Sequence, residues 1–137
     1  MQMTLFAVLV MAVLGLSGLA IDGGQLFVAR RDTQALADAA ARAGAAQLDE
    51  TALRSDPGQP PSIDPAMATE AATAYVAEVR PQATIAILDV DASHITVQVT
   101  SPPVSVTLLQ LAGTGKAMQV EATGEAVPET GITQPGQ

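Results

Sequence analysis

Cysteine and aromatic residues are the scarcest components of this 137-residue sequence, which has no Cys, no Trp, two Phe and one Tyr. Without cysteine the chain has no disulfide, no thiol nucleophile and no cysteine-based metal site. A usual zinc site is also excluded, because His94 is the single histidine. The length suits one compact domain and is too short for two.

Basic residues are also few, with six Lys and Arg against 14 Asp and Glu, and the net charge is -8. Nucleic-acid binding needs a basic surface, so nucleic acid is excluded as a partner. Yet 48% of the residues are hydrophobic, and the mean hydropathy is +0.31. A uniformly mixed globular domain rarely combines acidity with such hydropathy, so the position of the apolar residues matters.

The apolar residues are concentrated at the amino terminus, where residues 1–21 contain no charged side chain. About 20 apolar residues span a bilayer core of about 30 Å. The run Leu5–Ile21 has about 17, the lower limit of that range, and Leu26–Ala29 extends it past Asp22. We therefore expect a transmembrane helix over residues 1–29, with the lipid bilayer as a partner.

A cleavable secretory signal is the alternative interpretation of this segment. Gly18 and Ala20 satisfy a small-x-small cleavage rule, but no basic segment precedes the apolar run. The sequence therefore favours a retained helix.

Alanine dominates the next segment, with eight alanines among the twelve residues 35–46. Alanine has the highest helix propensity, which predicts that the membrane helix continues through residues 30–50. Asp38 and Arg42 are spaced for a helical ion pair. Small side chains would let another helix or sheet approach closely, although alanines can also be simple helix formers. The residues predicted to share one helical stripe are Leu26, Ala29, Thr33, Leu36, Ala40 and Ala43.

Small residues also recur within and just after the apolar run. Gly15 and Gly18, and the Ala20–Gly24 pair, have spacings that permit close helix packing in a bilayer, or the glycines are tolerated defects. The complete set expected to serve assembly or helix packing is Gly15, Gly18, Asp22, Gly24, Arg30, Arg31, Leu36, Asp38, Ala40 and Arg42.

Asp22 has two possible environments. If the membrane ends near Ile21, Asp22 faces water at the interface, which is the expectation we favour. If the membrane extends to Ala29, the carboxylate needs a partner such as Arg30 or an amine of a neighbouring subunit. Our hypothesis is that Asp22 makes an inter-subunit contact, which Asp22→Asn tests through assembly and membrane retention.

The remainder predicts a small α+β head. Residues 51–64 form a Pro-rich linker, and an amphipathic helix over 65–79 follows the Asp64-Pro65 cap. Alternating apolar residues predict antiparallel strands over 84–90, 94–100 and 116–127. Residues 104–112 are expected to be a short helix or a turn-rich connection. The head thus covers residues 65–127, and residues 128–137 form a flexible tail.

No motif specifies catalysis, a cofactor or a metal. Asp89, Asp91 and Ser93 match the first places of a calcium loop, but His94 and Thr100 stand where Gly and Glu are required. The segment 113–116 resembles part of a phosphate loop but lacks its first Gly and its Ser/Thr. We interpret both as turns, expect His94 at the surface, and predict that the protein is not an enzyme.

The order of these parts resembles a known family. An apolar helix ends in Gly18-Leu-Ala-Ile-Asp22-Gly-Gly, Phe27-Val-Ala-Arg30-Arg31 follows, and Gln34-Ala-Leu-Ala37-Asp38-Ala-Ala-Ala41 and Ala43-Gly44-Ala45 complete the pattern. This is similar to the amino-terminal signature of TadE/TadG-like proteins of the Flp, or tight-adherence (Tad), pilus assembly system. The resemblance covers roughly residues 5–48. Members often carry a preceding basic segment, and longer relatives a large extracytoplasmic domain, so this chain would be a short, pilin-like member.

The resemblance implies a single-pass protein of the bacterial inner membrane, with its carboxyl-terminal head outside the cytoplasm or at the cell surface in a pilus. Its partners would be other pilus or Tad secretion subunits, together with possible self-association. Arg30 and Arg31 alone would favour a cytoplasmic head under the positive-inside rule. The alternative function is a membrane-tethered extracytoplasmic module that binds a partner protein outside any filament.

Overall fold

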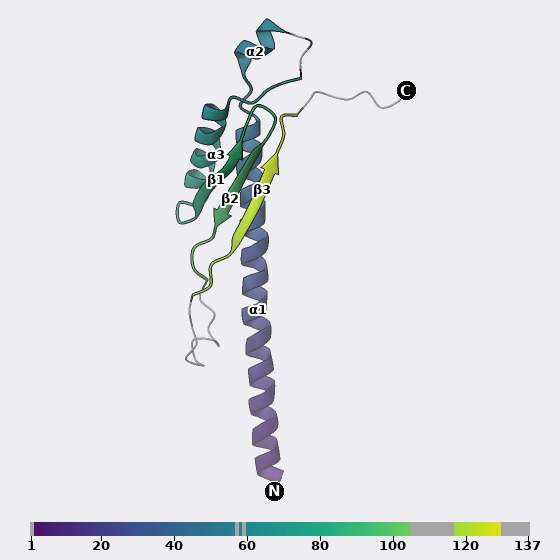
Figure 1. Cartoon of the computed structure of the whole chain (residues 1–137). Coiled ribbons are helices and arrows are strands. Elements are labelled where there is room, and N and C mark those ends of the chain that lie inside the picture. The colour runs from purple at the N-terminus through teal and green to yellow at the C-terminus, as the bar shows by residue number, and fades with distance from the viewer. Residues whose placement is uncertain (1, 57, 59, 105–116, 130–137) are drawn as a thin grey trace, which may run out of the picture.

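The computed structural model describes residues 2–56, 58, 60–104 and 117–129, and Figure 1 shows a long helix that carries a small head. The expected α+β fold class is confirmed. The elements in chain order are α1 (Gln2–Ala45), α2 (Glu50–Ser55), α3 (Pro65–Val79), β1 (Thr84–Val90), β2 (Ile95–Thr100) and β3 (Glu121–Ala126).

Helix α1 is continuous over 44 residues. It contains no proline, and its second half is rich in alanine, so no residue type forces a break. Its amino-terminal half projects beyond the head, whereas its carboxyl-terminal half lies against the sheet (Figure 1). The expected membrane helix and its alanine-rich continuation are therefore one continuous helix, which ends at Ala45 and not at residue 50 as predicted.

The sheet has the order β1-β2-β3, and both strand pairs are antiparallel. Its inner face is set by strand alternation, because Ile95, Val97 and Val99 of β2 are all fully buried. A β-bulge between Ile87 and Asp89 shifts the register of β1 near the hairpin. The sheet therefore has one apolar face toward the helices and one polar face of Thr, Gln and Glu side chains.

The core lies between this apolar face, α1 and α3. Leu36 and Ala40 are buried, as the predicted stripe requires, and Thr33 is buried with them. Leu26, Ala29 and Ala43 at the same stripe are half-buried. The buried face of α1 is broader than predicted, because three further alanines belong to it: Ala37, Ala41 and Ala45.

Two glycines let the backbones approach closely. A Cβ on Gly124 of β3 would overlap the carbonyl group of Ala37 and lie 2.7 Å from the backbone nitrogen of Asp38. A Cβ on Gly44 would lie 2.7 Å from Ile95 Cδ1 and 3.0 Å from the carbonyl oxygen of Ala68. The alanine face of α1 therefore packs almost directly against backbone.

The segment expected to be a linker is more ordered than predicted, because it contains α2. The Asp49 carboxylate caps this helix by accepting from the backbone of Thr51 at 2.9 Å and of Ala52 at 3.0 Å. The backbone nitrogen of Asp49 donates to Ser62 at 2.8 Å. The prolines of this segment predicted an extended linker over all of residues 51–64. They begin only after α2 has ended, so they do not prevent this helix.

The predicted helix over 65–79 and the strand over 84–90 are confirmed with the same bounds. Strand β2 begins one residue later than predicted, and β3 is shorter than the predicted 116–127. Before β3, Val104 and Met118 form an isolated antiparallel bridge. The rest of the connection over 104–112, the turn at 113–116 and most of the tail lie outside the described residues.

Candidate membrane and assembly surface

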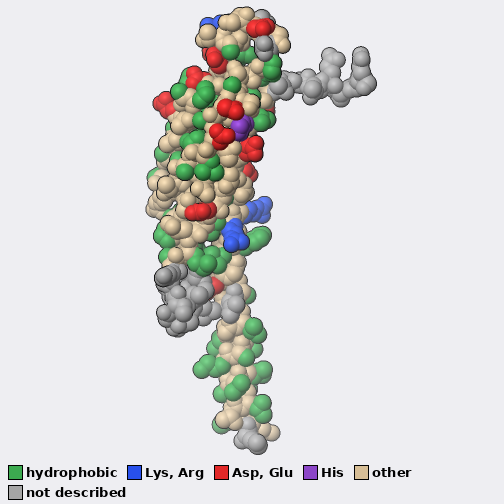
Figure 2. Space-filling model, viewed as in Figure 1, with side chains coloured by type: hydrophobic (Ala, Val, Ile, Leu, Met, Phe, Trp, Pro, Cys, Tyr) green, Lys and Arg blue, Asp and Glu red, His purple; other side chains and the backbone are tan. Residues whose placement is uncertain are grey.

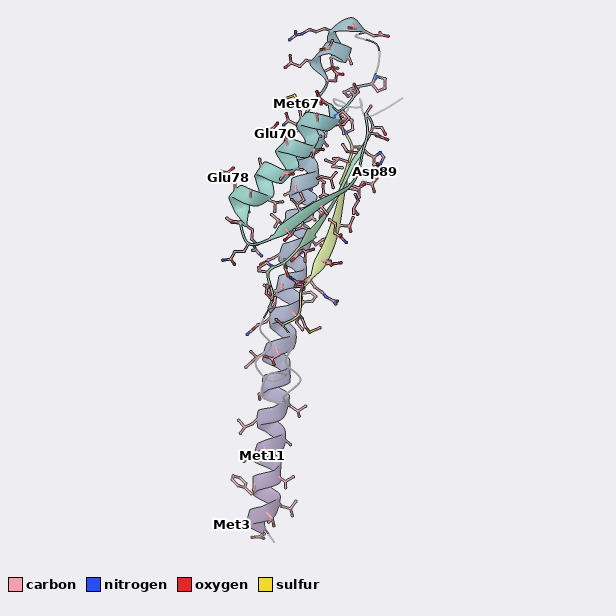
Figure 3. The ribbon with its side chains drawn as sticks, turned by 60° about the vertical axis from the view of Figure 1, so that its left-hand side comes forward. Met3, Met11, Met67, Glu70, Glu78 and Asp89 are labelled. Atoms are coloured by element: carbon pink, nitrogen blue, oxygen red, sulfur yellow. The ribbon has the colours of Figure 1, made fainter. Side chains whose placement is uncertain are left out.

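The amino-terminal half of α1 is an uncovered apolar surface. Its side chains are largely exposed, for example Leu5 at 72% and Met11 at 76%. Figure 3 shows Met3 and Met11 on the part of the helix that the head does not reach. Among the described residues, α1 is the one helix long and apolar enough to cross a membrane, and none of its most apolar 18-residue window is buried.

The polar serine in this segment is satisfied within the helix. The Ser17 hydroxyl donates to the backbone carbonyl of Val13 at 2.8 Å. In a bilayer, where water is absent, such internal bonding removes the cost of an unsatisfied polar group. Ser17 therefore does not oppose insertion of α1.

Three glycines of α1, Gly15, Gly23 and Gly24, are not required by the described fold of one chain. Apart from the adjacent residues and the backbone of α1 itself, no heavy atom lies within 4 Å of a Cβ built on Gly15, Gly23 or Gly24. This contrasts with Gly44 and Gly124, where a Cβ would clash. The predicted packing residues Gly15 and Gly24 are thus free for contact with something outside this chain, whereas Gly18 is half-buried.

Asp22 does not face water. Its residue surface is only 7% exposed, whereas the preceding Ile21 is 63% exposed. The expectation of a water-facing carboxylate is therefore wrong, because the rest of the folded chain covers this residue. An inter-subunit contact by Asp22 stays a prediction, and it would require this carboxylate to be uncovered.

The arginines of α1 are exposed on its surface. Among the described residues, Arg30, Arg31 and Arg42 form no ion pair, whereas Arg80 lies 3.8 Å from Asp32. The predicted pair of Asp38 with Arg42 is not formed.

Instead, the Gln34 amide donates both to Asp38 Oδ1 at 2.9 Å and to the backbone carbonyl of Thr123 at 2.8 Å. Gln34 therefore ties the Asp38 carboxylate to the edge strand β3.

A groove lies beside these residues, between α1 and the chain entering β3. One wall consists of Gly23, Leu26, Phe27, Arg30 and Gln34, and the other of residues 118–122. Phe27 is 68% exposed and Met118 is 47% exposed, so the apolar side chains of the groove are open to solvent. Sequence reasoning did not find this groove, because its two walls are about 90 residues apart.

The hairpin between β1 and β2 is a separate polar cluster. His94 Nε2 lies 3.2 Å from Asp89 Oδ2, and His94 Nδ1 lies 3.1 Å from Asp91 Oδ1. The cluster appears as red and purple side chains high on the head in Figure 2.

Hydrogen bonds and neighbouring charges shift the pKa of both kinds of group in this cluster. Bonds from the Ser93 backbone, the Ser93 hydroxyl and the His94 backbone lower the pKa of Asp91 to about 2. Partial desolvation lowers the pKa of His94, but Asp91 and Asp89 outweigh it and raise the pKa above its ordinary value.

The Asp91 carboxylate is used to hold the turn. Its Oδ1 accepts from the Ser93 backbone at 2.6 Å, the Ser93 hydroxyl at 2.8 Å and the His94 backbone at 2.9 Å. Within the described part of the chain, no group of three or more His, Cys, Asp or Glu side chains could hold a metal ion.

Fold and surface together define a class of protein: a small α+β head on one long helix whose apolar half is uncovered. More particularly, residues 2–47, which include all of α1, match the family model Tad, described as "Putative Flp pilus-assembly TadE/G-like". This confirms the resemblance predicted from the order of motifs. Comparison with curated proteins and with solved structures found no match.

Proposed function

We propose that this protein is a membrane-anchored structural or assembly component of a Tad/Flp-type pilus system. The observation that carries the proposal is the uncovered apolar half of α1, which lies entirely within the segment that matches the pilus-assembly family. Exposure of so many large apolar side chains is unfavourable in water and favourable in a bilayer. An enzymatic role is not proposed, because the matched family is described by pilus assembly.

The geometry suits a single span that ends near Asp22. Residues 2–21 form about 20 helical residues, which at about 1.5 Å per residue reach about 30 Å, the thickness of a bilayer core. The wall of the groove begins at Gly23, so the head occupies the space beyond that level. This boundary is shorter than the sequence expectation of 1–29 and leaves Phe27 in the headgroup region.

Assembly through α1 is supported by the free space around Gly15 within the span and around Gly24 just beyond it. Without a driving force from water, helices in a bilayer associate by close packing, for which small residues are suited. The proposed partners are other pilus or Tad secretion subunits, or a second copy of this chain. We place the head outside the cytoplasm, in accord with the family resemblance and against the bias of Arg30 and Arg31.

Membrane retention of the full chain tests the anchor. The double variant Val8→Arg with Met11→Arg should release the protein from the membrane fraction, because each central arginine disfavours insertion by about 2.5–3.5 kcal/mol. The matched control is Leu88→Arg with Val127→Arg, two exposed positions of the head, which should leave retention unchanged. Equal retention of both variants would contradict the anchor.

Co-purification tests the assembly role in the same cells. Tad secretion subunits should be recovered with the wild-type chain and with the head control. A reporter fused to the carboxyl terminus should be active only outside the cytoplasm. Recovery of a single partner unrelated to pilus assembly would instead support the tethered binding module.

A further inference from the structure

The groove beside Phe27 lies at the level where α1 leaves the proposed span. Along α1, the apolar Leu26 and Phe27 come first, and the polar Arg30 and Gln34 follow toward the head. Arg30 lies about 4.5 Å further along the helix axis than Phe27, at about 1.5 Å per residue. The groove is therefore apolar on its membrane side and cationic above.

Among the residues that the structure describes, no carboxylate forms an ion pair with Arg30 in the groove. The chain has 14 acidic residues. Two of them form ion pairs with arginines, as Glu50 pairs with Arg54 at 2.7 Å and Asp32 lies 3.8 Å from Arg80. Within the described ranges, neither Arg30 nor Arg31 forms such a pair. This leaves two adjacent guanidinium groups available for an external anion.

Glu121 also lines the groove, but its carboxylate has another contact. Glu121 Oε2 accepts from Gln98 Nε2 at 3.4 Å on the polar face of the sheet. In Figure 2, the main gathering of acidic side chains, around the histidine, lies higher on the head than the two basic groups beside α1. Other acidic side chains lie at the height of these basic groups and below them (Figure 2), so the proposed site rests on Arg30 and Arg31, which form no ion pair among the described residues, and not on a separation of charge over the whole molecule.

We propose that this groove binds an anionic phospholipid. Arg30 holds the phosphate in charge-assisted hydrogen bonds, and Arg31 adds a second positive charge at the same height. Leu26, Phe27 and Met118 contact the glycerol region and the first methylenes of the acyl chains. The inference rests on the proposed anchoring, because that anchoring brings the groove to the headgroup level.

The occupant is a lipid because the groove places a cation above an apolar wall. A phospholipid has the matching arrangement, with its anionic phosphate above its acyl chains. A second copy of this chain is a weaker match. Its exposed acidic hairpin of Asp89 and Asp91 could face Arg30, but the strand face beside that hairpin is polar and would not cover the apolar wall of the groove. The bilayer also surrounds this level of α1 with headgroups at high local concentration.

Lipid enrichment around the full chain tests the inference. The protein is placed in nanodiscs of phosphatidylcholine with about one-fifth phosphatidylglycerol, then extracted gently, and the two retained lipids are quantified. Each surface arginine favours anionic lipid by about fivefold. Arg30→Ala should therefore lower the enrichment of phosphatidylglycerol about fivefold. Arg42→Ala, an exposed arginine further along the same helix, should leave it unchanged.

Two further arms separate the sources of phosphate and the kinds of partner. Inorganic phosphate at matched ionic strength should leave the enrichment intact, because free phosphate does not use the apolar wall. Loss of enrichment in that buffer would overturn the lipid assignment. The inference is also overturned if Arg30→Ala weakens self-association while phosphatidylglycerol enrichment stays at the wild-type level.

Failure of the inference is distinguishable from failure of the anchor. Integration into discs of pure phosphatidylcholine depends on α1 alone and should succeed for the wild type and for Arg30→Ala. Integration without any phosphatidylglycerol preference would refute the lipid site and leave the anchor standing. Absence of integration in every disc would refute the proposed anchor itself.

Discussion

Gly124 is the residue at which the sheet and α1 touch through backbone alone. Strand alternation assigns position 124 to the apolar face, but nothing in the local sequence requires glycine there. The requirement comes from Ala37 and Asp38 of α1, which occupy the space of a Cβ. Here the absence of a side chain sets the distance between two elements.

Gly124→Ala should therefore lower the free energy of unfolding by about 1–3 kcal/mol, the range of overpacked core substitutions. Urea unfolding of the full chain in detergent micelles, followed by circular dichroism, measures the change. The control is Gly23→Ala, where a Cβ meets no atom of another element within 4 Å and the gain in helix propensity is up to about 1 kcal/mol. Equal effects of both substitutions would contradict the close approach.

His94 makes the stability of the β1–β2 hairpin depend on pH. Its pKa in the folded chain lies above the ordinary value of 6.5. Its charged form is therefore favoured by folding, and this stabilisation is complete below pH 6.5 and is lost as the pH rises through the folded pKa. Asp91 behaves oppositely, since its stabilisation is present above 3.8 and is lost as the pH falls toward about 2.

We expect the melting temperature of the full chain in detergent to fall slightly between about pH 6 and pH 8. His94→Gln removes the titrating group, so its melting temperature should fall less over this interval. A pH titration of the His94 ring protons by NMR should give a midpoint above 6.5. A midpoint below that value would show that desolvation outweighs Asp89 and Asp91.

At the scale of elements, α2 and α3 have the same type of N-cap, an aspartate, but differ in how they pack against the core. Asp64 accepts from the backbone of Ala66 at 2.9 Å and of Met67 at 3.1 Å. Asp49 caps α2 in the same way, yet α2 has no buried residue. Helix α3 buries Ala68, Ala72 and Val76 against the core. Loss of the two caps should therefore have different consequences.

Asp64→Ala should destabilise the whole head by about 1 kcal/mol, the usual cost of a lost N-cap. Asp49→Ala should fray α2 and leave global unfolding nearly unchanged, because no core residue depends on it. Urea unfolding reports the first effect, and amide hydrogen exchange at residues 51–55 reports the second. A global loss of similar size for both variants would show that α2 belongs to the cooperative core.

At the scale of the whole molecule, the protein has a folded head and an exposed apolar helix, for which we propose different solvents. The head buries its apolar residues against alanines and glycines, whereas the first half of α1 keeps large apolar side chains exposed. The glycines divide in the same way, since Gly44 and Gly124 serve folding and Gly15 has free space. Association of copies and stability of the head should therefore be separable by substitution.

Gly15→Leu should weaken self-association in vesicles by about tenfold, on the scale of 1–2 kcal/mol for packed helix contacts in membranes. The stability of the head should not change. Energy transfer between labelled copies measures association. Val13→Leu is the control, because position 13 lies about 200° around the helix from position 15. Unchanged association of Gly15→Leu would remove Gly15 from the proposed contact.

Much of the architecture was predictable from local pattern. Helix α3 was predicted with its bounds because a cap, a proline at the first turn and a terminating Arg80-Pro81 all act within a few residues. The strands followed from alternation, and the apolar half of α1 followed from the absence of charge. Helix α2 was missed, because proline content outweighed a six-residue helix in the prediction.

The sequence by itself determined the apolar half of α1, the alanine-rich half and the order of helices and strands, because propensity and periodicity act between near neighbours. Only the tertiary structure decided that Asp22 is buried and that Gly124 meets Ala37. It also joined Gln34 to Thr123, 89 residues away, and placed Arg30 in a groove with Met118. These features depend on where the sheet packs along α1. That position is determined by contacts between residues that are far apart in the sequence.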